Sequence, residues 1–78
     1  MLLVNQTKDL ILNMDNVTSL YIEKKTNSIK AKVTGEEGAY HLGTYQSLDD
    51  CKKVLEEMMH AYSVVCADYK MPLGGAVR

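Results

Sequence analysis

The hydrophobic pattern of the chain changes its period at Ser47, and this change constrains the fold more than any other feature. Before Ser47, apolar and polar residues alternate in short runs, as they do in half-buried strands. From Leu48 to Tyr62, apolar residues recur every three or four positions, as on one face of a helix. The chain has 78 residues, 46% of them hydrophobic, which is enough for one core. The pattern therefore predicts one domain in which a sheet packs on a single helix.

The predicted helix begins at about Leu48. Ser47 precedes it as an N-cap and Asp50 follows three residues later, which is a capping-box-like pattern. The residues predicted to form its buried face are Cys51, Val54, Leu55, Met58, Ala61 and Tyr62. On the other face, Lys52 and Lys53 each stand four residues before a glutamate, an arrangement typical of a solvated surface. This run of charge therefore indicates no ligand site.

Three strands that form a meander are predicted before the helix. Apolar and polar residues alternate in "VTSLYIEKK" and "SIKAKVTG", and the turn-forming stretches "KTNS" and "GEEG" separate these strands from each other and from "AYHLGTY". Gly43 in the third strand indicates a bulge, because a glycine inside a strand often marks one. The predicted core consists of Leu20, Ile22, Ile29, Ala31, Val33, Leu42, Val54, Leu55 and Met58.

Short strands are also predicted near both ends of the chain. "LLVN" and "KDLILN" precede the meander, and "SVVCADYKMP" follows the helix and ends at Pro72. We therefore predict an α+β fold, with an antiparallel sheet of about five or six strands packed against one amphipathic helix in the order β-β-β-β-β-α-β. The domain spans residues 1–72, and residues 73–78 form a flexible C-terminal tail.

The histidines and cysteines do not have the spacing of a metal site. The chain lacks the close C-x2-C and H-x3-H pairs of structural zinc. Cys51 and His60 lie nine residues apart on the predicted helix, and at about 100° per residue they point to opposite sides of it. We therefore predict no metal and no cofactor, with Cys51 as a small core residue. The parity of Cys66 in the last strand favours its exposed face.

Charge and the N-terminal pattern limit the partners and the location. Nine basic and ten acidic residues give a formal net charge of −1, so the chain lacks the positive field on which phosphate-backbone binding usually depends. The apolar start turns polar at Asn5, which is too early for a signal peptide or a membrane span. We therefore expect a cytoplasmic protein with free thiols, no membrane contact and no general nucleic-acid binding.

Four short segments combine turn, cap and core residues: V-N-Q at 4–6, N-M-D-N at 13–16, L-G-T-Y-Q-S at 42–47 and Y-K-M-P at 69–72. Together they resemble a group of small uncharacterised proteins from Gram-positive bacteria and their phages, over nearly the whole chain. The resemblance implies one intact domain and a phage or prophage origin, and it brings no activity and no site residues with it. Related chains carry a longer loop between the helix and the last strand.

No catalytic constellation is visible, so we predict that the protein is not an enzyme. Ser47, Cys51 and Cys66 each have a structural explanation, and the glycine-rich pieces lack the Lys and Ser/Thr of a phosphate loop. The alternative to an interaction role is nucleic-acid binding by a hairpin that carries four lysines. These are Lys24, Lys25, Lys30 and Lys32.

Five tyrosines exceed what one small core usually needs, which predicts a protein-interaction module with a host or phage protein as its partner. The candidate interaction surface consists of Tyr21, Lys30, Lys32, Tyr45 and Tyr69. In the alternative interpretation, most of these rings cover the core and keep their hydroxyl groups in water.

The predicted terminal strands carry apolar side chains on both of their faces, which predicts self-association. Leu10 and Leu12 on one strand, and Val64 and Cys66 on another, would be left uncovered by a single helix. A chain of this size buries too little surface alone to hide them. We therefore predict a homo-oligomer, with a dimer favoured, in which exposed faces or edge strands meet.

Overall fold

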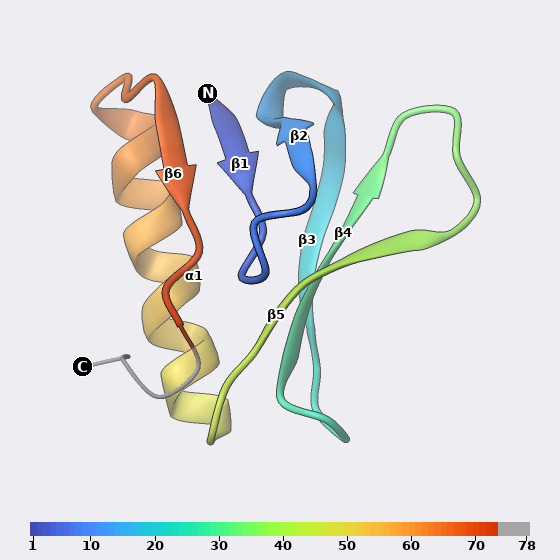
Figure 1. Cartoon of the computed structure of the whole chain (residues 1–78), viewed down its shortest axis with the longest axis vertical. Coiled ribbons are helices and arrows are strands. Elements are labelled where there is room, and N and C mark those ends of the chain that lie inside the picture. The colour runs from blue at the N-terminus through green and yellow to red at the C-terminus, as the bar shows by residue number, and fades with distance from the viewer. Residues whose placement is uncertain (74–78) are drawn as a thin grey trace.

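One α-helix, one short 3-10 helix and six strands make up residues 1–73, the part of the chain that a computed structural model describes (Figure 1). The elements are β1 (Leu2–Val4), β2 (Ile11–Asn13), the 3-10 helix η1 (Met14–Asn16), β3 (Val17–Glu23), β4 (Ser28–Val33), β5 (Ala39–Thr44), α1 (Leu48–Ser63) and β6 (Asp68–Lys70). The predicted α+β class, with a sheet-forming chain and one helix, is confirmed. The predicted tail lies, from residue 74 onward, outside the described residues.

The strands form two sheets, so the prediction of one antiparallel sheet was wrong. Sheet A has the order β2-β1-β6 and sheet B the order β3-β4-β5. In Figure 1, α1 and β6 lie on the left, sheet B lies on the right, and β1 and β2 lie between them. The pair β1–β6 is parallel, with Leu3 opposite Tyr69. An alternating pattern assigns each residue to a face but names no neighbouring strand, which is why it predicted the strands and not their pairing.

The core lies between α1 and the two sheets. Leu3 at the centre of sheet A, Ile29 in β4 and Val54 in α1 are fully buried. Of the predicted core, Ile29, Ala31, Leu42, Val54 and Met58 are buried, while Leu20, Ile22, Val33 and Leu55 are partly buried against it. The centre of the predicted core is therefore confirmed, and the residues at its border are only partly buried.

Helix α1 begins where the capping pattern predicts. Ser47 is the N-cap, and its Oγ accepts a hydrogen bond of 3.1 Å from the backbone N–H of Asp50. The buried face contains Cys51, Val54, Met58 and Ala61. Tyr62 was predicted on this face but is 46% exposed, because it lies at its edge in the last turn of the helix. The helix is too short and too polar to span a membrane, and no other helix is present in residues 1–73 that could do so.

The last strand is shorter than predicted. Val65 adopts a left-handed φ of 59° and is 87% exposed, so the chain turns after the helix before it enters β6. Cys66 is exposed, as its parity suggested, but it lies in this turn and not in a strand. The apolar Val64 and Val65 therefore belong to a tight helix-to-strand connection.

The predicted bulge in β5 is confirmed. Ile29 pairs with Gly43 and Lys30 pairs with His41, which leaves Leu42 as the extra residue on β5. A Cβ atom on Gly43 would lie 3.0 Å from the Tyr45 hydroxyl oxygen and 3.3 Å from the Gln6 Cβ. The glycine therefore allows two neighbouring side chains to pack directly against the strand.

Candidate functional site: two edges of sheet B

Three of the five residues of the predicted interaction surface come together on the face of sheet B that points away from α1. Tyr21 in β3 lies directly opposite Lys30 in β4, and Lys32 is two residues further along the same face. The Lys30 Nζ lies 2.7 Å from Glu23 Oε1. This contact lowers the pKa of the Glu23 carboxyl and raises the pKa of Lys30. The charge of Lys30 is therefore balanced within its own sheet.

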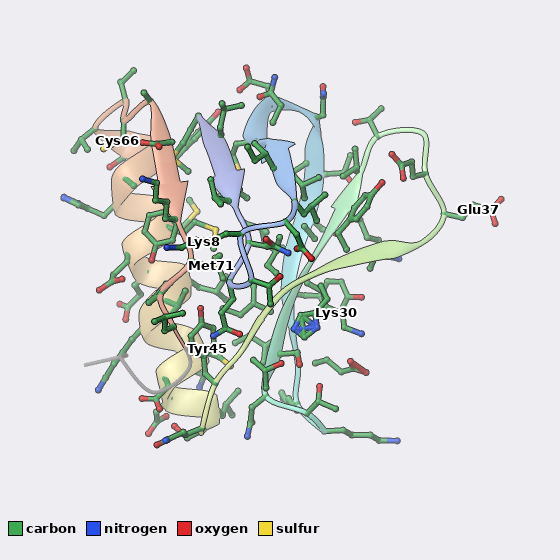
Figure 2. All side chains as sticks on the ribbon, in the orientation of Figure 1. Lys8, Lys30, Glu37, Tyr45, Cys66 and Met71 are labelled. Atoms are coloured by element: carbon green, nitrogen blue, oxygen red, sulfur yellow. The ribbon has the colours of Figure 1, made fainter. Side chains whose placement is uncertain are left out.

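Tyr45 and Tyr69 lie elsewhere and pack their rings inside the molecule. Tyr45 is 4% exposed and donates a hydrogen bond of 2.8 Å to the Pro72 carbonyl. Figure 2 shows it between α1 and β5, apart from Lys30. Tyr69 is partly buried, and its hydroxyl donates to Glu57 Oε1 at 2.9 Å. Burial raises the pKa of both phenols. These two residues thus follow the alternative interpretation, in which tyrosine rings cover the core.

The β5 edge of sheet B is closed by a glutamine side chain. The Thr44 N–H donates to Gln6 Oε1 at 3.0 Å, and Gln6 Nε2 donates back to the Thr44 carbonyl at 3.0 Å. The Gln6 backbone N–H donates to the Leu42 carbonyl at 2.7 Å. Gln6 Nε2 also lies 3.1 Å from the Pro72 carbonyl. One residue therefore occupies the hydrogen-bonding groups that a neighbouring strand would use at the Leu42–Thr44 end of β5.

The loop that presents Gln6 is held rigid by Asn5, which is almost fully buried. Its Oδ1 accepts from the backbone N–H groups of Asp9 and Leu10, and its Nδ2 donates to Asp9 Oδ1 at 2.8 Å. Thr7 donates a further hydrogen bond to the same Asp9 oxygen at 2.7 Å. The Thr7 and Asn5 hydrogen bonds lower the pKa of the Asp9 carboxyl. The closed edge therefore rests on an internally bonded polar loop.

The β3 edge of sheet B is open. Within residues 1–73, β3 pairs with β4 on one side and with no strand on the other. With seven residues it is the longest strand in the described chain. Its ladder to β4 is regular from Ser19 to Glu23, and the register shifts at Thr18. An unpaired edge presents backbone N–H and C=O groups to whatever approaches it.

An apolar groove runs beside this edge, between β3 and the C-terminal half of α1. We call it the β3 groove; its volume is about 370 Å³, and it is lined by Met14, Val17, Thr18, Ser19, Leu20, Met59 and Tyr62. Met59 is 55% exposed and Tyr62 is 46% exposed. Large apolar side chains gathered at one open groove are typical of an interaction surface.

The two cysteines differ in burial, since Cys51 is buried and Cys66 is exposed. Cys51 is fully buried and its Sγ donates to the Asn27 carbonyl at 3.1 Å. Burial raises the pKa of this thiol, which opposes formation of the nucleophilic thiolate. Both cysteines are free. Between residues 1 and 73, no group of three His, Cys, Asp or Glu side chains lies close enough to hold a metal ion.

Sequence reasoning missed three residues that define the two edges. Gln6 appeared only within the resemblance, while Met14 and Met59 were left unassigned. Met59 follows the buried Met58 on α1, so an exposed methionine beside the core stripe was the one available signal for the β3 groove. Nothing in the local pattern links Gln6 to Thr44, which is 38 residues away.

Comparison with known proteins adds no relative to this description. No family model matches the chain, and neither the curated proteins nor the solved structures give a significant match.

Proposed function

We propose that the protein is a protein-interaction module that takes up an extended polypeptide segment along the open edge of β3. The observation that carries the proposal is the coincidence of an unpaired strand and an apolar groove beside it. Addition of a strand supplies main-chain hydrogen bonds along the edge, and alternate side chains of the guest enter the adjoining groove.

The groove determines the chemistry of the guest. Its side-chain lining is formed mainly by methionines, aliphatic residues and one tyrosine, so guest side chains that enter it should be apolar. Met14 and Met59 have flexible thioether chains, which adapt to guests of different shape. The resemblance to small proteins of bacteria and phages suggests a host or phage protein in the cytoplasm as the source of such a segment.

Nucleic-acid binding by the lysine hairpin is the weaker proposal. Lys30 is paired with Glu23, and the β4–β5 loop beside the hairpin carries Glu36 and Glu37. Figure 2 shows Glu37 at the outer end of that loop. The other lysines of the hairpin belong to a chain whose formal net charge is −1. A phosphate backbone would therefore meet a mixed field rather than a basic patch.

Peptide selection followed by NMR titration tests the proposal. Displayed random peptides are selected against the folded protein, and their binding is mapped by amide shift changes. We expect selected peptides to shift β3 amides and residues of the β3 groove. Met59→Lys should weaken their binding about tenfold, because a charge would be buried in an apolar contact.

His60→Lys is the matched control, because His60 is the next residue of α1 and is exposed outside the β3 groove. It should leave peptide binding unchanged. Peptides that shift other parts of the molecule, or that bind the Met59→Lys variant as well as the wild type, would contradict the proposal. A selection that yields no binder for a protein that sediments as a monomer would do the same.

A further inference from the structure

We infer that the segment seated on β3 is the β3 strand of a second copy, so that two chains join their B sheets edge to edge around a two-fold axis. The inference rests on the proposed use of the β3 edge and names its occupant. A two-fold interface uses the same patch twice, and β3 would have to complement itself. The residues of β3 meet this condition in one register.

Other edges are poorer candidates for this contact. The β5 edge is occupied by Gln6 through its bonds to Leu42 and Thr44. Strands β2 and β6, at the two edges of sheet A, have three residues each. Within residues 1–73, β3 alone offers a free edge of five regularly paired residues, Ser19 to Glu23.

Two-fold symmetry restricts the register. When the axis stands perpendicular to the sheet, each side chain keeps its face in the second copy, and residues opposite each other in antiparallel strands share a face. A residue can therefore lie opposite only itself or a residue an even number of positions away. The irregularity at Thr18 limits regular pairing to Ser19–Glu23, whose centre is Tyr21. The longest regular overlap places Tyr21 opposite Tyr21 of the second copy.

This register pairs compatible side chains on both faces. On the core side, Leu20 would lie opposite Ile22 of the second copy, and both are apolar and half-buried. On the open face, the two Tyr21 rings, each 38% exposed in the single chain, would lie side by side. Aromatic pairs across neighbouring strands are favourable contacts.

Charge complements the same register. Ser19 would lie opposite Glu23 of the second copy, and Lys32 lies beside Ser19 on β4. Lys32 and that glutamate would be two strands apart, about 10 Å between Cα atoms, with only the small Ser19 between them. A lysine and a glutamate side chain together span that distance. Lys32 forms no ion pair within residues 1–73, so Glu23 of the second copy, which is already paired with Lys30 of that copy, would lie between two lysines.

The end of the β3 groove at Leu20 also becomes covered in this arrangement. Met59 and Tyr62 line the groove together with Leu20, which is next to the central Tyr21. The same residues of both copies would therefore approach the axis on the core side of the joined sheets. A second copy thus covers the Leu20 end of the groove with its Ile22, while its Lys24 would lie opposite Thr18 and could keep its ammonium group in water.

Cysteine cross-linking with sedimentation tests this arrangement. In a Cys66→Ser background, Tyr21→Cys should place two thiols opposite each other within the 4.4–6.8 Å Cα range of a disulfide. Ser19→Cys is the matched control on the same face, because its two copies would lie about 14 Å apart. Under a glutathione redox buffer, we expect at least about tenfold more covalent dimer from Tyr21→Cys than from Ser19→Cys. The unmodified chain should sediment at twice its mass of 8.7 kDa.

Three results would overturn the inference. A wild-type chain that stays at 8.7 kDa at millimolar concentration would exclude the second copy. A wild-type dimer whose Tyr21→Cys variant sediments as a dimer but cross-links no better than Ser19→Cys would place the contact elsewhere. A protein that remains monomeric while selected peptides bind its β3 edge would assign that edge to another protein. In that last case the proposed function stands, whereas a monomer that binds no peptide at β3 contradicts both.

Discussion

The two edge strands of sheet B differ in how their outer backbone groups are bonded. An edge strand exposes a row of unpaired backbone groups, and a protein must cover them or use them. At β5, the amide of Gln6 bonds both to the N–H and to the C=O of Thr44, and the Asn5 loop holds it there. At β3, no strand or side-chain amide of this kind is present in the described chain, and apolar side chains line the adjoining groove.

The difference suggests that the β5 edge serves the fold of the single chain and the β3 edge serves contact with another chain. The closed edge joins the loop of sheet A to sheet B, and a polar contact of that kind fixes one arrangement of the two sheets. The open edge pairs with no other strand of residues 1–73, and the exposed Met59 and Tyr62 of α1 lie beside it. Surface that contributes little to the fold of one chain is available for contact with another.

Loss of the closing side chain should give the largest effect. Gln6→Ala removes the side-chain bonds to Thr44 and Pro72, and we expect it to lower the free energy of unfolding by about 2 kcal/mol, because water replaces these bonds only in part. Urea unfolding measures the change. Ser19→Ala at the open edge is the control and should stay within about 0.5 kcal/mol of wild type. Equal losses in both variants would remove the distinction between the edges.

A methyl group added at the closed edge should have the next largest effect. Gly43→Ala would bring a Cβ to 3.0 Å from the Tyr45 hydroxyl and 3.3 Å from the Gln6 Cβ, which forces both side chains to shift. We expect a loss of about 1 kcal/mol in thermal or urea unfolding. Gly38→Ala serves as the control, because no atom lies within 4 Å of its added Cβ. A Gly43→Ala variant as stable as Gly38→Ala would show that this edge is loosely packed.

Protonation of Asp9 at acid pH should give the smallest of the three losses of stability. The Thr7 and Asn5 hydrogen bonds lower the pKa of Asp9 below its ordinary value of 3.8, so the folded state favours the carboxylate. The resulting stabilisation is present at neutral pH and is lost as the pH falls through the folded-state pKa. Stability measured from about pH 5 downward should therefore fall less steeply in Asp9→Asn than in wild type. An identical slope in both proteins would contradict a role for this carboxylate.

Signals carried by neighbouring residues made part of the fold predictable. Ser47 and Asp50 defined the start of α1, and Gly43 marked the bulge, because caps and bulges are set within a few residues. The alternating pattern also identified the centre of the core, as at Ile29 and Leu42.

Features that depend on distant segments could not be predicted from local patterns. The parallel pairing of Leu3 with Tyr69 joins residues from opposite ends of the chain. The closure of β5 by Gln6 and the opening of β3 follow from that placement of sheet A. Tyr45 illustrates the same limit at the candidate site, because only the packed fold distinguishes a core tyrosine from an exposed one such as Tyr21.

Amide hydrogen exchange at several protein concentrations tests the contrast between the two edges most directly. The N–H of Thr44 is bonded to Gln6 within one chain, so its exchange rate should not depend on concentration. Amides of Ser19–Glu23 that point away from β4 should exchange rapidly in dilute protein and become protected, by about tenfold or more, as the concentration rises into the range where dimers form. Protection of these β3 amides that stays the same at every concentration, while the mass remains 8.7 kDa, would contradict the account.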